Sequence, residues 1–219
     1  MVERRFSKPL VPVRFWHPAP KMKTSKKFRD LIDFIQFTHE FREVIRVARA
    51  PYADRYENDA EHSYQLAMVA WYLIETDGLN LNRELCFMYA LAHDLVEVYA
   101  GDTYTFDTNQ NNHLNKKDRE KKALLKIKKR FPKFKLMVRI IEKYESKKDK
   151  ESKFIYALDK LIPPIQIFLE KGKLWNERKI SLEKIIDNKS KKISISKTID
   201  VYWQELLREL IKDNKKLFL

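Results

Sequence analysis

The chain has 219 residues, of which 44% are hydrophobic, 35% are charged and only three are glycine. This length and apolar content suit one globular domain with a substantial core and exclude an intrinsically disordered chain. The scarcity of glycine, with long stretches of Lys, Glu, Leu, Ile and Ala, favours an all-α fold over one built from many strands and tight turns.

The composition also bears on the compartment. A single cysteine, Cys86, excludes an intramolecular disulfide, so nothing requires an oxidising environment. No apolar run approaches the roughly 18 residues of a membrane-spanning helix. Four prolines interrupt the first 20 residues, where a signal peptide would have its apolar region. We expect a cytoplasmic protein with no membrane partner.

The net charge of +14 is unevenly distributed. Residues 28–115 carry 6 basic and 15 acidic side chains, whereas residues 116–150 carry 16 basic and 5 acidic ones. The basic excess therefore lies outside the segment that holds most of the candidate site residues. A lysine-rich, solvated helix surface is the simpler interpretation, and a surface that binds nucleic acid or another polyanion is the alternative.

The N-terminal part of the chain predicts an arm followed by one helix. Residues 1–25 are rich in proline and basic groups, which is typical of an extended arm ahead of a single domain over residues 26–219. Apolar residues from Phe28 to Ile45 recur at helical spacing, which predicts a first helix that ends before Pro51.

Two further helices are expected before residue 100. One should begin after Asn58, because its side chain can cap the helix and Glu61 can complete a capping box. Gly78 should end this second helix. A third helix, from about Asn82 to Tyr99, is apolar on several faces, which predicts a place at the centre of a bundle.

The remainder of the chain predicts a loop and more helices. Residues 103–115 are polar and resemble a loop of the kind that often shapes a site. Further helices are expected near residues 116–130, 132–146, 150–170, 178–188 and 195–213. Pro163 and Pro164 should kink the third of these. Three tryptophans at helical spacing are expected in the core: Trp71, Trp175 and Trp203.

Metal-binding side chains occur in three fragments on three different expected helices. They are His62, the pair His93-Asp94, and Asp159. Two imidazoles and two carboxylates suit one divalent cation such as Mn²⁺, Co²⁺, Fe²⁺ or Mg²⁺, with open positions for water and substrate. Asp94 lies in an otherwise apolar segment, where an unpaired charge would cost several kcal/mol, and a metal ion is a suitable partner. Each residue alone is more often a cap or a surface group, so the combination carries the interpretation.

This ordered set of His, His-Asp and a distant Asp resembles the HD-domain metal-dependent phosphohydrolases. The run His-Asp-Leu-Val-Glu-Val-Tyr-Ala-Gly-Asp over residues 93–102 is similar to a segment of the branch that includes bacterial 5'-deoxynucleotidases and related uncharacterised HD hydrolases. The resemblance covers about residues 28–170. It implies an HD-domain helical bundle, hydrolase activity on a small phosphorylated substrate such as a nucleotide, and a homo-oligomer, in particular a dimer.

The resemblance also implies roles for individual residues. The ligands of one divalent metal ion would be His62, His93, Asp94 and Asp159. Glu97 would be the acid/base residue, and Asp102 would complete the catalytic site by contacting the sugar hydroxyl. On the expected third helix, Glu97 follows His93 by four residues and Asp94 by three, so all three should share one face.

The resemblance assigns the substrate phosphate to Arg46, and a guanidinium matches a phosphate dianion well. Arg46 should lie at the end of the first helix, and Arg49 and Arg55 compete for the same role. The characterised deoxynucleotidases carry a tryptophan just after this arginine, whereas Val47 follows it here. A preference for deoxyribose is therefore not implied.

Three functional hypotheses follow. The first is hydrolysis of nucleoside 5'-monophosphates to a nucleoside and phosphate. The second keeps the metal site but acts on a longer phosphorylated nucleotide, such as a nucleoside triphosphate or an alarmone, with the lysines of residues 116–150 binding the additional phosphates. The third is a catalytically silent module that binds nucleic acid or an acidic partner. The complete ligand set and the presence of Glu97 argue against the third hypothesis.

Overall fold

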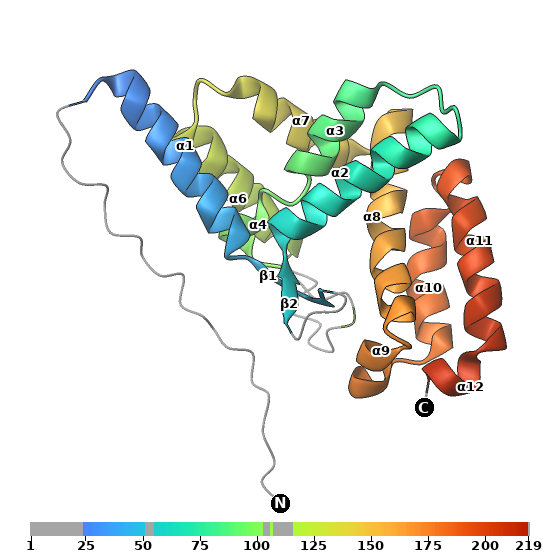
Figure 1. Ribbon diagram of the computed structural model, residues 1–219. Coiled ribbons are helices and arrows are strands. Elements are labelled where there is room, and N and C mark those ends of the chain that lie inside the picture. Colours follow the sequence, from blue (N-terminus) through green and yellow to red (C-terminus); the bar gives the residue numbers. More distant parts are fainter. Residues whose placement is uncertain (1–23, 51–54, 103–105, 107–115, 219) are drawn as a thin grey trace, which may run out of the picture.

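The computed structural model describes residues 24–50, 55–102, 106 and 116–218. Most of these residues form helices, and the described part of the chain also contains one two-stranded sheet. The predicted all-α fold is therefore confirmed (Figure 1). The predicted arm lies outside the described residues except at its last two positions. Of the predicted loop over 103–115, only Phe106 is described.

The first helix is shorter than predicted. Helix α1 (Lys26–Arg42) begins after Ser25, whose side chain accepts a hydrogen bond from the Phe28 amide. The chain then forms strand β1 (Ile45–Arg49), which pairs antiparallel with strand β2 (Tyr56–Asn58). The prediction of one helix up to Pro51 is therefore wrong, because β2 supplies backbone hydrogen-bond partners that local periodicity does not reveal. Arg46 lies on a strand, not at a helix end.

Helix α2 (Asp59–Thr76) begins as predicted. The Asn58 side chain accepts a hydrogen bond of 3.0 Å from the Glu61 amide, and the Glu61 carboxylate accepts one of 3.1 Å from the Asn58 amide. This capping box satisfies two backbone donors and fixes where the helix starts. The helix ends next to Gly78, which has a φ of 60°.

The predicted central helix is divided into two. Helix α3 (Arg83–Ala92) is capped by Asn82 as expected, and helix α4 (Glu97–Ala100) follows after a break at residues 93–96. In the break, the amides of Leu95 and Glu97 bond to carbonyl groups only three residues back. This tighter winding interrupts the α-helix and sets the direction of the segment that carries the His-Asp pair.

The C-terminal half is a series of helices. Their bounds are α6 (Lys116–Arg130), α7 (Lys135–Ser146), α8 (Lys150–Leu169), α9 (Lys173–Arg178), α10 (Leu182–Ile193), α11 (Lys197–Lys212) and α12 (Asn214–Leu217). The five predicted helices are present, and the short helices α9 and α12 were not predicted. Helix α8 continues through Pro163 and Pro164, so the two prolines do not end it.

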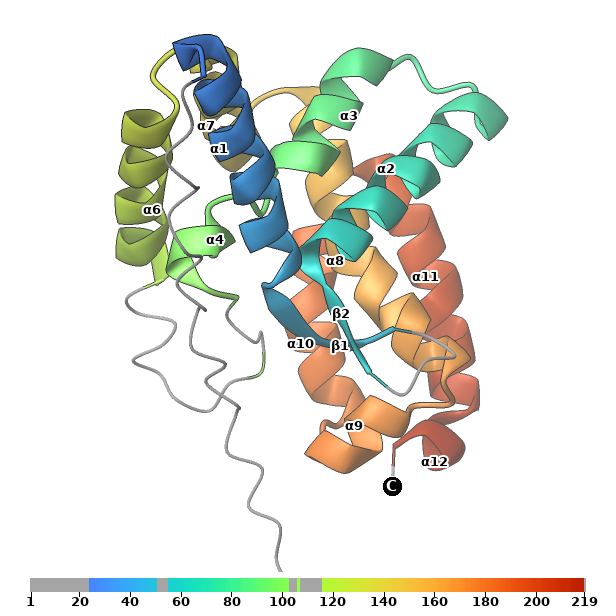
Figure 2. The ribbon, with the colours of Figure 1, turned by 60° about the vertical axis from the view of Figure 1, so that its left-hand side comes forward.

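Helix α8 is the central element of the bundle. It contacts α2, α3 and α7 on one side and α10 and α11 on another, and strand β1 also packs against it (Figure 1). Helices α1, α4 and α6 lie together at the end away from α11 (Figure 2). Trp175 and Trp203 are buried in the core as predicted, but Trp71 is 49% exposed, which corrects its assignment. Helical spacing shows that residues share one face of a helix, but it does not show whether other elements cover that face.

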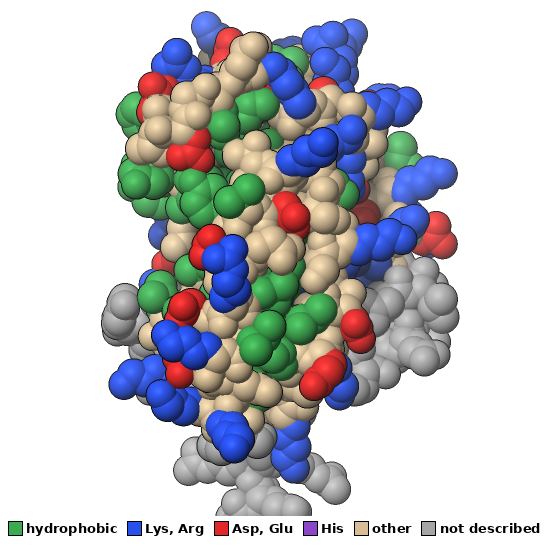
Figure 3. Space-filling model, turned by 90° about the vertical axis from the view of Figure 1, so that its right-hand side faces the viewer, with side chains coloured by type: hydrophobic (Ala, Val, Ile, Leu, Met, Phe, Trp, Pro, Cys, Tyr) green, Lys and Arg blue, Asp and Glu red, His purple; other side chains and the backbone are tan. Residues whose placement is uncertain are grey.

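Charged side chains cover much of the surface. Figure 3 shows Lys and Arg spread over one face, with Asp, Glu and apolar side chains among them. Not all basic side chains of residues 116–150 are free at the surface to bind a partner, because Arg130 forms ion pairs with Asp33 and Glu40 on α1. None of the helices that the structure describes combines the length and the apolarity needed to cross a membrane.

Candidate metal centre

Three of the predicted metal ligands come together around α8. His62 lies in the first turn of α2, His93 follows the end of α3, and Asp159 lies on α8. Their ligand-type atoms lie within 4.8 Å of one another, and all three side chains are buried. His62 Nε2 is 3.0 Å from Asp159 Oδ1, and His93 Nε2 is 4.0 Å from the same oxygen. This group could hold a metal ion.

The hydrogen bonding of His93 suits a metal ligand. Its Nδ1 lies 2.9 Å from the Ala90 carbonyl oxygen, which only accepts, so Nδ1 carries the proton. Nε2 then faces the cluster, 2.9 Å from Asp94 Oδ2, and makes no hydrogen bond within the described residues. Burial would lower the pKa of the ring, but Asp94 and Asp159 outweigh it and raise the pKa. Metal-ligating histidines commonly have this arrangement, with the second ring nitrogen donating to a backbone carbonyl.

A second group of possible metal ligands adjoins the first, and all three of its members are acidic. Ligand atoms of Asp59, Asp94 and Glu97 also lie within 4.8 Å of one another. Asp94 and Glu97 thus converge even though the helix breaks between them. Asp59 is fully buried and was missed as a site residue, although its spacing could have revealed it: Asp59, His62 and Leu66 lie three and seven residues apart on one face of α2.

Arg46 reaches this acidic group from strand β1. Its Nη1 lies 2.8 Å from Asp94 Oδ2 and 3.2 Å from Asp59 Oδ1, and its Nε lies 3.2 Å from Glu57 Oε1. Glu57 is the second buried carboxylate that sequence reasoning did not select. Because Arg46 meets three acids at once, a single guanidinium partly offsets the negative charge of the centre.

The two competing arginines have other partners. The Arg49 guanidinium lies 3.2 Å from Glu177 on α9, and the Arg55 guanidinium lies 2.6 Å from Glu61 near the surface. The structure therefore brings Arg46 to the predicted site and pairs Arg49 and Arg55 elsewhere.

The ionisation of the acids shows that the centre holds excess negative charge. Burial, followed by repulsion from Asp94, raises the pKa of Asp59 to about 8. Burial and the same neighbour raise the pKa of Glu97 well above its ordinary value. Burial would also raise the pKa of Asp94, but His93 and Arg46 outweigh it and the pKa falls below its ordinary value. Acids that cannot all ionise together are stabilised by a divalent cation.

The residues present therefore fit a divalent cation. Burial, with Arg46 as the next cause, lowers the pKa of His62 to about 4, so its ring is neutral at pH 7 and can act as a ligand. Several buried nitrogen and oxygen atoms that could bind a metal ion lack a hydrogen-bond partner within the described residues: His62 Nδ1, His93 Nε2, Asp59 Oδ2 and Glu97 Oε2. Unsatisfied buried polar atoms are costly, and a metal ion with its water molecules would satisfy them.

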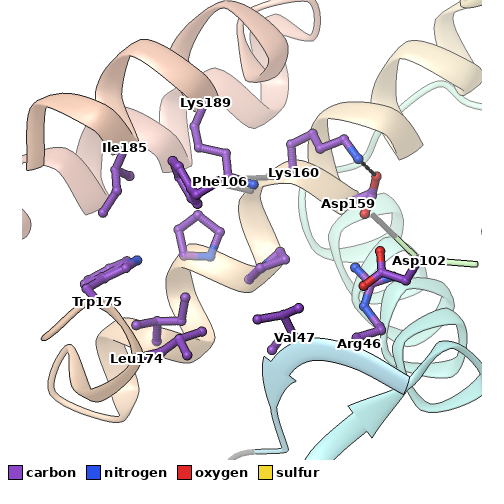
Figure 4. Close-up of a pocket in the computed structure, with 14 residues that line it drawn as sticks. Arg46, Val47, Asp102, Phe106, Asp159, Lys160, Leu174, Trp175, Ile185 and Lys189 are labelled. Carbon is purple, nitrogen blue, oxygen red and sulfur yellow. Dashed lines mark ion pairs between the residues drawn. The ribbon is translucent and has the colours of Figure 1, made fainter. Parts of the chain in front are cut away.

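A pocket extends from the centre towards the C-terminal helices (Figure 4). Its polar end is lined by Arg46, Asp102, Asp159 and Lys160, so Asp102 lies in the same pocket as Arg46. The lining of the remainder is mainly apolar: Val47, Phe106, Pro163, Pro164, Ile167, Leu174, Trp175 and Ile185, with Lys189 among them. Sequence reasoning did not assign Lys160, Lys189 or Trp175 to a site.

Comparison with known proteins identifies the family. A family model described as HD domain matches residues 38–199. The chain belongs to the HD-domain family. This membership confirms the predicted resemblance. The matched segment contains both groups of possible metal ligands, and it also contains α10, which forms part of the pocket wall.

Individual relatives of this HD domain have been described. The chain is 30% identical over 135 residues to the 5'-deoxynucleotidase HDDC2 of Homo sapiens, over 60% of this chain and 64% of that protein. It thus spans a little under two thirds of the length of that relative. A predicted metal-dependent phosphohydrolase from Magnetospirillum magnetotacticum has a similar crystal structure, with a TM-score of 0.73 and 25% identity, over 87% of this chain and 97% of that one.

A conserved hypothetical protein from Pyrococcus furiosus shares the fold, with a TM-score of 0.58 and 20% identity, over 83% of this chain and 99% of that one.

Proposed function

We propose that this HD domain is a metal-dependent phosphohydrolase that acts on nucleoside 5'-monophosphates and releases a nucleoside and phosphate. The observation that carries the proposal is the convergence of two imidazoles and four carboxylates on one buried centre beside Arg46. The proposal is further supported by the similarity to the human 5'-deoxynucleotidase and to the bacterial phosphohydrolase.

One divalent metal ion would be held by four residues: His62, His93, Asp94 and Asp159. Their nitrogen and oxygen donors suit Mn²⁺, Co²⁺, Fe²⁺ or Mg²⁺. When bound, the ion supplies Lewis acidity, which polarises the phosphoryl group and makes a water molecule a better nucleophile near neutral pH.

Glu97 would handle the proton. Its carboxyl group is buried beside Asp94, and burial and repulsion from Asp94 raise its pKa well above the ordinary value. Oε2 of Glu97 has no hydrogen-bond partner within the described residues; it can take a proton from the attacking water molecule and deliver it to the 5'-oxygen as the bond from phosphorus to that oxygen breaks. The products are then a neutral 5'-hydroxyl and inorganic phosphate.

Arg46 and Asp102 would recognise the two ends of the ribose phosphate. Arg46 provides the guanidinium that neutralises the phosphate, and Asp102 lines the same pocket and would accept a hydrogen bond from the sugar 3'-hydroxyl (Figure 4). The apolar part of the pocket, between Val47 and Trp175, would receive the base. Val47 replaces the tryptophan of the characterised deoxynucleotidases, so we propose no preference for deoxyribose.

Glu97→Gln tests the proposal directly. The wild-type chain, loaded in turn with Mn²⁺, Co²⁺, Mg²⁺ or Fe²⁺, should release phosphate from a panel of nucleoside 5'-monophosphates. Glu97→Gln keeps the shape of the side chain but removes its ionisable group, so turnover should fall by roughly 10²- to 10⁴-fold with unchanged metal content. Glu142→Gln makes the same change at an exposed position on α7 and should have no effect.

Near-normal turnover by Glu97→Gln would assign the proton transfer to another group. Absence of phosphate release by the wild type with every metal would contradict the monophosphatase proposal.

A further inference from the structure

The wall of the pocket opposite the candidate metal centre contains a buried lysine. Lys189 projects from α10 and is only 6% exposed. Figure 4 shows it reaching from α10 towards Lys160 and Phe106, between the polar end of the pocket and the apolar end at Trp175. A ligand that spans the pocket from Arg46 to Trp175 therefore passes the Lys189 ammonium group.

Among the residues that the structure describes, Lys189 has no counterion, whereas Lys116 and Lys160 do. Lys116 and Lys160 form ion pairs with carboxylates, and Lys192 donates a hydrogen bond to a side-chain amide. Within the residues that the structure describes, the Lys189 ammonium group forms neither an ion pair nor a hydrogen bond with the protein. A buried charge without a partner costs several kcal/mol, so this position is suited to an anion that is not part of the chain.

Other lysines disfavour the charged form of Lys189. Burial, followed by repulsion from Lys160, lowers the pKa of Lys189 to about 7, and Asp159 opposes this shift. Burial and repulsion from Lys160 and Lys116 lower the pKa of Lys192 as well. Lys160 and Lys189 both line the pocket, so their two ammonium groups can act together on an anion there.

We propose that Lys189 and Lys160 form a second anion site, which binds a phosphate group other than the one held by Arg46. This inference rests on the proposed function and extends its substrate class: nucleoside 5'-diphosphates, which carry a second phosphate and keep the 3'-hydroxyl proposed to contact Asp102, are better substrates than simple 5'-monophosphates. Ammonium groups act as point charges that pair with phosphate oxygens. Free inorganic phosphate offers the same chemistry, and the experiments below separate the two sources.

Lys189→Met is the test variant, because methionine preserves the length and the apolar part of the side chain. With the metal-loaded full chain, kcat/KM for a nucleoside 5'-diphosphate should fall by about 10-fold or more. Because Lys189 also lines the pocket, the value for the matching 5'-monophosphate falls too, but the ratio of the two values should shift against the diphosphate by about 5-fold or more. Lys191→Met removes the same charge from an exposed position on the same helix and should behave as wild type. Lys189→Gln is a second test variant and should show the same loss. Agreement between the two variants would show that the loss is not caused by the methionine side chain itself.

A binding measurement provides a second readout. Calorimetric titration of the Co²⁺-loaded full chain with inorganic phosphate should give two phosphates per chain for wild type and Lys191→Met, and one for Lys189→Met. If Lys189→Met loses one phosphate but discriminates between substrates as wild type does, the occupant is free phosphate. If Lys189→Met matches wild type in both phosphate stoichiometry and substrate discrimination, the second anion site is refuted.

The same titration separates this inference from the proposed function. If no nucleotide is hydrolysed by wild type with any of the four metals, but phosphate binding still depends on Lys189, the anion site stands and the monophosphatase proposal fails.

Discussion

Buried carboxylates determine the chemistry of the candidate metal centre. Asp59 and Glu97 have raised pKa values because burial and mutual repulsion disfavour their charged forms. His93 and Arg46 provide compensation at Asp94, whose pKa is lowered despite burial. A divalent cation would favour the ionised form of every one of these acids, so metal binding and proton release are linked at this centre.

Lys189 should make stability depend on pH. Its pKa in the folded protein is about 7, against 10.5 in an unfolded chain, because of burial and repulsion from Lys160, Lys192 and Arg46, which outweigh attraction by Asp159. Between these two values the unfolded chain binds the additional proton, so the free energy of unfolding rises with pH. Lys189→Met lacks this ionisation. Its stability advantage over wild type should therefore be largest below about pH 7 and shrink as the pH rises from 7 to 10.

Urea unfolding of both proteins at several pH values measures this difference. Lys191→Met, altered at an exposed position, should differ from wild type by a constant amount across the same range. An advantage of Lys189→Met that does not change with pH would show that Lys189 keeps an ordinary pKa.

At the scale of elements, sequence patterns predicted what local interactions determine. The capping box formed by Asn58 and Glu61 joins residues three positions apart, so the start of α2 could be read from the sequence. The hairpin of β1 and β2 depends on pairing across a turn, and apolar spacing from Phe28 to Ile45 gave no sign of it. The break between α3 and α4 was missed for a related reason: an apolar segment can continue through a change in winding.

The sequence could predict candidate site residues where the residue type alone indicates metal binding, but it could not predict their arrangement in space. His62, the His93-Asp94 pair and Asp159 could be selected as candidates because their residue types suit a metal ion. Lys189 could not be found, since one lysine among many in a lysine-rich chain carries no signal until the fold buries it. Burial by α8 and α10 is a tertiary property that no local pattern encodes.

Arg130 joins three elements through one side chain. At the end of α6, its guanidinium donates to Asp33 and Glu40 on α1 and to the Tyr99 hydroxyl on α4. Arg130→Met should lower the free energy of unfolding by about 2 kcal/mol, because it removes charge-assisted hydrogen bonds and leaves both acids unpaired. Denaturant unfolding measures the loss.

Arg139→Met is the matched control for this prediction. Arg139 is exposed on α7, so its replacement should change stability by less than about 0.5 kcal/mol. Equal effects of the two substitutions would show that the network around Arg130 does not hold α1, α4 and α6 together.

At the scale of the whole molecule, the candidate metal centre and its pocket depend on distant parts of the chain. The hairpin supplies Arg46, α2 and the α3–α4 break supply His62, His93 and Asp94, and α8 supplies Asp159. Helices α9 and α10 complete the pocket wall through Trp175 and Lys189, among others. The site therefore exists only in the folded protein, and a ligand bound there must stabilise the fold.

The metal content of wild type and Asp94→Asn tests the central claim most directly. After loading with Mn²⁺ or Co²⁺ and removal of free metal, elemental analysis should find about one ion per wild-type chain and far less in Asp94→Asn, which lacks one charged ligand. Asp118→Asn, the same change at an exposed position on α6, should retain the ion. Equal and negligible metal in all three proteins would contradict the account of a metal centre formed by His62, His93, Asp94 and Asp159.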